Sequence, residues 1–178
     1  MRKVTTFEER LEDGNDKEDF VRDYLNLSGI PCKLNNEENP MDIDLYLPYD
    51  DLYIDVKHLQ THFDATHYLD FLTAENNLIV SVKHLKNYRK KQEKTGIESW
   101  IAFLVNYNIN GKIIFELRYI KVDDIFKLEY QGKAVRRTIT SPSGYKTRII
   151  NLNRLDCLDG FSFFNYIKCR RKNHVKCL

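Results

Sequence analysis

The side chains whose chemistry is easiest to interpret lie in residues 52–57, Leu-Tyr-Ile-Asp-Val-Lys. This segment alternates apolar and polar residues, which is typical of a half-buried strand. Side chains two residues apart on a strand point to the same face, so we expect Asp55 and Lys57 on one face. A carboxylate beside an ammonium suits two tasks: the acid can hold a cation, and the lysine can orient or deprotonate a water molecule.

A second alternating segment, residues 42–47, precedes this one and adds two more acids. Asp42 and Asp44 share one face of the expected strand, and the Pro-Tyr-Asp-Asp turn that follows predicts a β-hairpin with the Asp55 strand. The hairpin can bring one or both of these carboxylates beside Asp55. We prefer Asp42, at the start of the strand, as the partner of Asp55, with Asp44 as the alternative.

Such a cluster of acids predicts a metal site. Carboxylates held close together raise each other's pKa unless a cation lies between them, and clustered oxygen ligands suit Mg²⁺ or Mn²⁺. The candidate metal ligands are Asp42, Asp44 and Asp55, with Asp42 or Asp44 joining Asp55 and the Val56 carbonyl as a candidate additional ligand. Lys57 would act on the attacking water and stabilise charge on a phosphate, so these parts suit hydrolysis of a phosphodiester. The competing interpretation is an exposed Asp55–Lys57 ion pair, which contributes little.

The elements around this hairpin predict a mixed α/β fold in one domain, residues 1–178. Apolar spacing predicts one helix over 17–27, begun by an Asp-Gly-Asn-Asp turn at 13–16 and ended by Ser28-Gly29. We expect the core to span about 14–128 and a basic C-terminal extension to cover about 129–178. The other expected elements are a basic helix at 83–94, strands at 100–105 and 112–120, a short helix at 122–128 and short strands in the tail.

The charges are distributed unevenly along the chain, although the net charge is only +2. Residues 1–80 contain 18 acidic and 7 basic side chains, whereas residues 128–178 contain 11 basic and 3 acidic. This asymmetry favours a carboxylate-rich metal site beside a surface that attracts phosphate, and it also permits a chance segregation that folding mixes again.

These residues together resemble the PD-(D/E)XK nuclease superfamily. Asp55-Val56-Lys57 matches the acid-x-lysine element, and Pro40-Met41-Asp42 resembles the Pro-Asp element with one extra residue between them. Glu18 resembles the helical acid that such nucleases place near the metal. Gln92 and Tyr88 resemble the polar helix that follows the hairpin and positions the scissile strand.

The resemblance spans roughly residues 14–121 and implies both fold and activity. It implies a restriction-endonuclease-like mixed central sheet flanked by helices, and a Mg²⁺-dependent DNA endonuclease of phage, repair, resolvase or restriction type. It implies Glu18, Asp42, Asp55, Lys57 and Gln92 as catalytic residues. The alternative function is a catalytically inactive nuclease-like module that binds nucleic acid or a protein. A homodimer is a further expectation, since cutting two strands requires two active sites.

Basic residues downstream of the hairpin are candidates for contacts with the DNA backbone. Phosphate contacts from basic side chains position a nucleic acid without reading its sequence. The competing interpretation is a set of solvated lysines and arginines, with Tyr88 packed in the core. The residues assigned to nucleic-acid binding are Lys83, Tyr88, Arg89, Lys91, Arg136, Arg137, Lys146 and Arg148.

The cysteines and the hydropathy of the chain give weaker expectations. Cys157, Cys169, His174 and Cys177 are a disfavoured candidate set for structural zinc, because no Cys-x-x-Cys pair is present. No apolar run approaches the roughly 20 residues that a membrane helix needs, and no signal peptide begins the chain. We therefore expect no membrane partner and a cytoplasmic protein, in the host-cell cytoplasm if it is viral.

Overall fold

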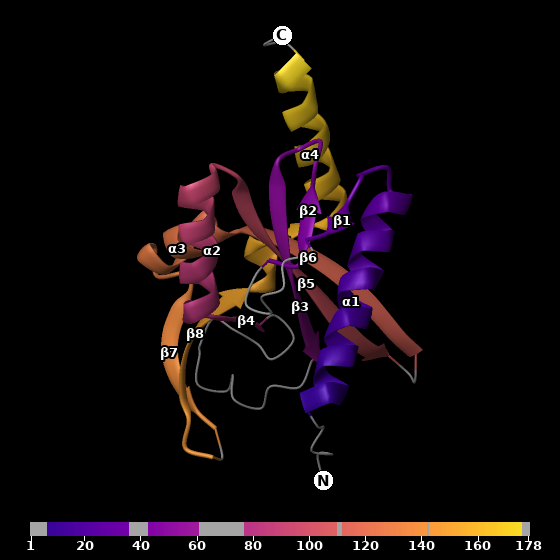
Figure 1. The fold of residues 1–178 in the computed structure, drawn as a ribbon. Helices are drawn as coiled ribbons and strands as arrows, with labels where there is room; N and C mark the ends of the chain where they lie inside the picture. The colour runs from indigo at the N-terminus through magenta and orange to yellow at the C-terminus, as the bar shows by residue number, and fades with distance from the viewer. Residues whose placement is uncertain (1–6, 36–42, 61–76, 110–111, 142, 176–178) are drawn as a thin grey trace.

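The computed structural model describes residues 7–35, 43–60, 77–109, 112–141 and 143–175. Helices separate groups of two or more strands along the chain (Figure 1). In chain order they are α1 (Phe7–Leu27), β1 (Lys33–Leu34), β2 (Leu45–Leu47), β3 (Leu52–Gln60), β4 (Asn77–Ser81), α2 (Val82–Thr95), β5 (Glu98–Ile109), β6 (Lys112–Lys121), α3 (Val122–Tyr130), β7 (Val135–Thr140), β8 (Lys146–Asn153), the 3₁₀ turn η3 (Arg154–Asp156), β9 (Leu158–Asp159) and α4 (Gly160–Val175).

A six-stranded mixed sheet forms the centre of the fold, in the order β1-β2-β3-β5-β6-β9. Strands β2 and β3 pair as the expected antiparallel hairpin, with Leu45 opposite Ile54. Asp51 closes the turn with a φ of 46°, a left-handed conformation that aspartate tolerates better than most residues. The next neighbour, β5, runs parallel to β3, because β4 and α2 cross over between the two strands.

A second sheet of three strands, β4-β8-β7, lies beside the first, and the sequence did not predict it as a separate sheet. Strand β8 pairs with β4, which precedes it by more than 60 residues, and with β7 through a hairpin. Figure 1 shows α2 and the β7–β8 hairpin on one side of β3 and α1 on the other side.

Two apolar clusters cover the two faces of the central sheet. One packs α2, α3 and the second sheet against residues such as Tyr53 and Phe103. The other packs α1 and α4 against residues such as Val56 and Trp100. The side chains of β3 and β5 alternate between the two clusters, which is the result expected for strands covered on both faces.

Helix α4 makes the C-terminal segment part of this core. Phe163 is fully buried and stacks on Tyr119 of β6 with ring centroids 4.0 Å apart. Arg171 of α4 also forms a bidentate ion pair with the buried carboxylate of Asp50, at 2.8 and 2.7 Å, beside the β2–β3 turn. The residues expected as an appended extension therefore complete the packing of the hairpin.

The expected elements are mostly present, with differences at their ends. The turn expected at 13–16 is wrong: these residues lie inside α1, since the residues before them are strong helix formers. The helix expected at 83–94 is confirmed as α2 and ends at Gly96, whose φ of 73° suits glycine. Among the described residues, no helix combines the length and apolar character of a membrane span.

Candidate functional site

Asp55 and Lys57 lie on one face of β3, as their spacing predicted. Asp55 is only 1% exposed, and Lys57 Nζ lies 2.6 Å from Asp55 Oδ2. The neighbours of Asp55 in the strand, Ile54 and Val56, belong to the apolar cluster on the opposite face. The strand alternation therefore turns the Asp55 carboxylate towards α2 and buries it, which a surface ion pair would not require.

Asp44 is the upstream acid that the structure places beside this pair. Because Leu45 lies opposite Ile54, continuing the register sets Asp44 opposite Asp55. Its Oδ2 accepts a 2.7 Å hydrogen bond from the Val56 backbone N–H, and its carbonyl accepts one from Asn35. Asp42, the preferred partner on sequence grounds, lies outside the described residues.

The electrostatics of Asp44 follow from this crowded position. Burial and then the charge of Asp55, which outweighs the opposing effect of Lys57, together raise the pKa of Asp44 to about 8. At neutral pH the side chain of Asp44 is therefore largely protonated unless another cation approaches. A carboxylate that needs a second cation to ionise is a property expected of a metal ligand.

Glu18 of α1 interacts electrostatically with Asp55 and Lys57. Its side chain is partly buried, and burial followed by the charge of Asp55 raises its pKa. Burial alone would lower the pKa of Lys57, but the charges of Asp55, Asp44 and Glu18 outweigh it and raise the pKa. The structure thus brings together four sequence-predicted residues: Glu18, Asp44, Asp55 and Lys57.

Tyr88 of α2 completes the surroundings of Asp55 and corrects an expectation. It is 2% exposed, and its hydroxyl donates a 2.5 Å hydrogen bond to Asp55 Oδ1. A buried tyrosine has no face for a nucleic acid, so its assignment as a surface contact is wrong. The hydroxyl also lies 3.3 Å from His84 Nδ1, and burial followed by the charge of Lys57 lowers the pKa of His84.

The oxygen atoms around Lys57 fit a hard divalent cation. Asp55 Oδ2 is buried and, among the described residues, receives no well-aligned hydrogen bond; its neighbour is the Lys57 ammonium. The same ammonium donates to the Val56 carbonyl oxygen at 3.3 Å. Lys57 thus contacts two oxygen atoms that were expected to hold the metal. Within the part of the chain that the structure describes, no three His, Cys, Asp or Glu side chains are already gathered closely enough to ligate one ion.

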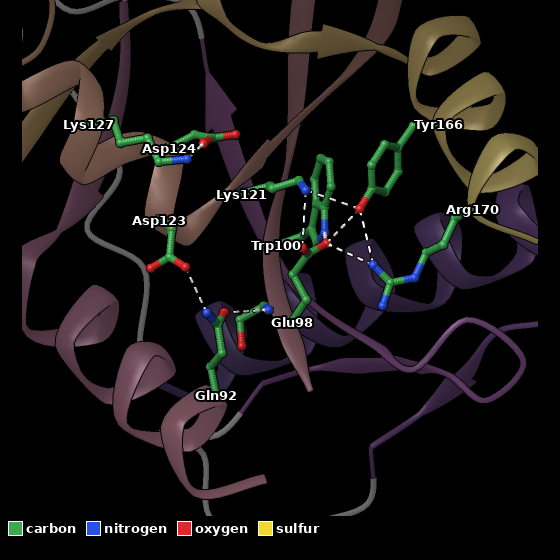
Figure 2. Close-up of polar contacts among 10 residues, drawn as sticks. Gln92, Glu98, Trp100, Lys121, Asp123, Asp124, Lys127, Tyr166 and Arg170 are labelled. Atoms are coloured by element: carbon green, nitrogen blue, oxygen red, sulfur yellow. Dashed lines mark hydrogen bonds and ion pairs between the residues drawn. The ribbon is translucent and has the colours of Figure 1, made fainter. Parts of the chain in front are cut away.

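Gln92 lies in a different set of contacts. Its Nε2 donates to Asp123 Oδ2 at 2.8 Å, and its Oε1 accepts from the Ser99 N–H at 3.0 Å (Figure 2). Both ends of the amide therefore connect α2 to α3 and to the start of β5. The structure does not bring Gln92 into the group around Asp55, because these contacts hold the amide at the end of α2.

The predicted nucleic-acid contacts fall into two groups. In the first, the side chain already has a partner: Arg89 lies near Glu93 and Asp123, Arg136 pairs with Glu129, and Lys91 lies over the Tyr53 ring. Arg137 is partly buried. In the second group are the exposed side chains Lys83, Lys146 and Arg148.

This second group lines a groove of about 620 Å³ between the start of α2 and the β7–β8 hairpin. Sequence reasoning did not assign Lys86, His84 or Tyr145, which also line it. Lys86 belongs to the basic helix expected at 83–94 and Tyr145 adjoins a basic turn, but no sequence signal predicted that the two segments meet, because this depends on β8 pairing with β4.

The candidate zinc ligands Cys157, Cys169, His174 and Cys177 do not form a zinc site among the described residues. Cys157 is buried and Cys169 is exposed, and both are free thiols. The side chain of His174 and the whole of Cys177 lie outside what the structure describes. Burial raises the pKa of the Cys157 thiol to about 12, which opposes the thiolate that zinc requires.

A second polar cluster anchors α4 beneath the same sheet (Figure 2). Glu98 accepts hydrogen bonds from Trp100, Lys121 and Tyr166, at 2.7, 3.0 and 2.9 Å. Burial raises the pKa of Glu98, but these donors outweigh it and lower the pKa. The charge of Glu98 is balanced by donors within this cluster. These hydrogen bonds therefore hold α4 against the strands that carry Glu98 and Lys121.

The fold is similar to that of a solved viral protein. The structure aligns over 98% of this chain and 99% of the other with a nuclease from a fusselovirus, at a TM-score of 0.51 and 13% sequence identity. No protein-family model and no curated protein matches the sequence. The alignment shows a nuclease-like mixed α/β fold with a central six-stranded sheet flanked by helices.

Proposed function

We propose that this protein is a Mg²⁺-dependent nuclease that hydrolyses DNA phosphodiester bonds, with a PD-(D/E)XK-type site on the β2–β3 hairpin. The observation that carries the proposal is the buried Asp55 carboxylate, which lies 2.6 Å from Lys57 Nζ and beside Asp44. The fold shared with a viral nuclease supports it. Endonucleolytic cutting is the form of the activity that we propose.

Asp44, Asp55 and the Val56 carbonyl would hold the ion, with Asp42 as a further candidate and Mn²⁺ as a substitute metal. The bound ion supplies stabilisation of the negative charge that builds up on the phosphate. Glu18 lies close enough to share in the charge balance of the site.

Lys57 would exchange its contact with Asp55 for one with the substrate. In the structure its ammonium pairs with Asp55 and contacts the Val56 carbonyl oxygen. With those oxygens engaged in holding a divalent cation, the Lys57 ammonium would be available to orient water or to stabilise a phosphate oxygen. Tyr88 holds Asp55 in one orientation through its 2.5 Å hydrogen bond.

The test measures cleavage of supercoiled, linear, branched and single-stranded DNA by purified protein with Mg²⁺ or Mn²⁺. We expect the wild type to cut at least one substrate, and Asp55→Asn and Lys57→Ala to cut at least roughly a hundredfold more slowly. Asp51→Asn is the matched control, because Asp51 is an exposed acid in the same hairpin. A wild type that cuts none of these substrates, or active-site variants that cut as the control does, would contradict the proposal.

The alternative function, a nuclease-like module that binds without cutting, gives a different result by calorimetry. A nuclease takes up Mg²⁺ at the hairpin, and Asp55→Asn abolishes the binding heat. A module that only binds a partner has no need for the ion there. Gel filtration with light scattering at several concentrations tests the proposed homodimer.

A further inference from the structure

The groove between α2 and the β7–β8 hairpin has the features of a ligand site. Its walls include Lys83, His84 and Lys86 from the first turns of α2, Tyr145 just before β8, and Lys146 and Arg148 from the start of β8. None of the described residues that line it is acidic. A concave surface of about 620 Å³ with one sign of charge concentrates anions.

The cations of this groove differ from many other cations of the fold. Arg118, Lys121, Arg154 and Arg171 each form an ion pair with a carboxylate of the protein. Across the described parts of the chain, no ion pair is formed by any of the four groove cations, Lys83, Lys86, Lys146 and Arg148. Four like charges around one groove repel one another, so an anionic ligand would relieve this repulsion.

The start of α2 adds backbone donors to these charges. Ser81 precedes the helix but makes no side-chain capping bond, and the first turn contains no acid. The first N–H groups of a helix lack internal partners and carry partial positive charge, which suits phosphate oxygens. Since Ser81 and Val82 line the groove, this end of the helix borders the unpaired lysines.

Tyr145 adds an aromatic ring to the same wall. It is 69% exposed, so about two thirds of its surface faces solvent. The turn that carries it is held by hydrogen bonds in both directions between Tyr145 and Ser141, at 2.8 and 3.0 Å. An exposed aromatic ring among cations is an arrangement on which an unpaired base can stack.

We propose that this groove binds a single-stranded segment of nucleic acid, with Tyr145 stacking on a base and the α2 start and four cations holding phosphates. A duplex keeps its bases stacked inside and offers no free base face to Tyr145. The groove therefore selects substrates with an unpaired strand, such as flaps, overhangs or single strands.

The groove also borders the acid cluster, which consists of Glu18, Asp44 and Asp55 around Lys57. This part of the inference rests on the proposed nuclease function. His84 lines the groove, its Nδ1 lies 3.3 Å from the Tyr88 hydroxyl, and that hydroxyl contacts Asp55 at 2.5 Å. Two side chains, His84 and Tyr88, therefore connect the wall of the groove to Asp55. The groove would bring the strand to the site, and the acid cluster would cut it.

The experiment measures binding without cleavage, by fluorescence anisotropy of the full chain in EDTA. The probes are a labelled single-stranded DNA of about 12 nucleotides, an abasic strand of the same length, an RNA of the same sequence and a blunt two-stranded duplex. The test variants are Tyr145→Ala and the double variant Lys86→Glu/Lys146→Glu. The double variant Lys90→Glu/Lys133→Glu is the control, because it changes the charge equally at exposed lysines outside the groove.

We expect the wild type to bind the single strand at least about tenfold more tightly than the duplex. Tyr145→Ala should weaken binding of the single strand at least about fivefold and leave binding of the abasic strand unchanged. Lys86→Glu/Lys146→Glu should weaken both at least about tenfold, and the control double variant less than about twofold. Circular dichroism melts confirm that each variant is folded. Similar affinities for DNA and RNA strands support the inference, because stacking and phosphate contacts do not require a 2′-hydroxyl.

Equal affinity for duplex and single strand, or equal losses in the groove and control variants, would overturn the inference. Tighter binding of the RNA strand than of the DNA strand would support the groove as a single-strand site and would identify RNA, not DNA, as its ligand. Failure of the nuclease proposal gives a different result. If the protein binds single strands in EDTA but never cuts with Mg²⁺, the binding groove is supported and the catalytic assignment is overturned. A protein that cuts, with groove variants that bind normally, gives the opposite result.

Discussion

The acid cluster on β3 and the basic groove beside α2 differ in how their charges are balanced. Asp55 is buried, and its partners Lys57 and Tyr88 come from within the protein. The lysines and arginine of the groove are exposed and, in the described structure, have no carboxylate beside them. The Asp55 carboxylate is thus paired within the protein, whereas the cations of the groove are left to a ligand.

This difference indicates what each region can do. A buried and internally paired carboxylate keeps a fixed orientation, which catalysis requires, and unbalancing it destabilises the fold. Exposed, unpaired cations contribute little to stability, so the fold tolerates changes to them. Matched substitutions in the two regions should therefore have unequal effects.

The largest difference is expected from removing one lysine in each region. Lys57→Met leaves the buried Asp55 without its cation, so we expect it to lower the free energy of unfolding by about 3 kcal/mol at pH 8 without metal. Lys83→Met should change it by less than about 0.5 kcal/mol. Urea unfolding measures both. Equal effects of the two variants at pH 8 would contradict the comparison.

A smaller difference is expected from removing one tyrosine hydroxyl in each region. Tyr88→Phe deletes the donor to Asp55 Oδ1, so we expect a loss of about 1.5 kcal/mol of stability. If the chain is a nuclease, kcat should also fall at least roughly tenfold with little change in KM, because Asp55 loses its orientation. Tyr145→Phe keeps the ring and should leave stability unchanged. Thermal unfolding and steady-state cleavage test the pair, and a Tyr88→Phe protein with wild-type stability and kcat would show that the hydroxyl has no positioning role.

The smallest effect concerns the pH dependence of Asp44. Its pKa is raised to about 8 in the fold, above that of an unfolded chain, so its contribution to stability is complete below about pH 4 and is lost as the pH rises towards 8. Without metal, the Tm of the wild type should fall between about pH 5 and about pH 8.5 by roughly 5 °C more than that of Asp44→Asn.

Mg²⁺ should reverse this loss at high pH, because the ion competes with the proton for the carboxylate. The reversal should be absent in Asp44→Asn. Identical pH profiles of the two proteins would mean that Asp44 is not the acid that the metal neutralises, and would favour Asp42.

The local pattern of the sequence was enough to predict the two strands that form the hairpin of the acid cluster. The alternation in residues 52–57 predicts β3, and the pairing with β2 follows from a four-residue turn. Gly96 at the end of the basic helix predicts where α2 stops. These predictions are confirmed because each depends on residues that lie close together in the chain.

Predictions that required distant contacts were less successful. Tyr88 was assigned to nucleic-acid binding, with core packing as the alternative, and it is buried against Asp55, 33 residues earlier. Gln92 was assigned to the site, but Asp123 and Ser99 occupy its amide. The aromatic stretch at 161–166 was not recognised as part of α4, because its apolar face is defined by Trp100 and Tyr119 of the sheet.

The sequence by itself determined the hairpin and the shared face of Asp55 and Lys57, because a strand repeats every two residues. The tertiary structure decided which acid joins them among the described residues, and it set Asp44 there through the Val56 N–H. It also decided which cations remain unpaired, since an ion pair depends on distance in space. Lys146 and Arg148 share a groove with Lys83 only because β8 pairs with β4, the strand that leads into α2.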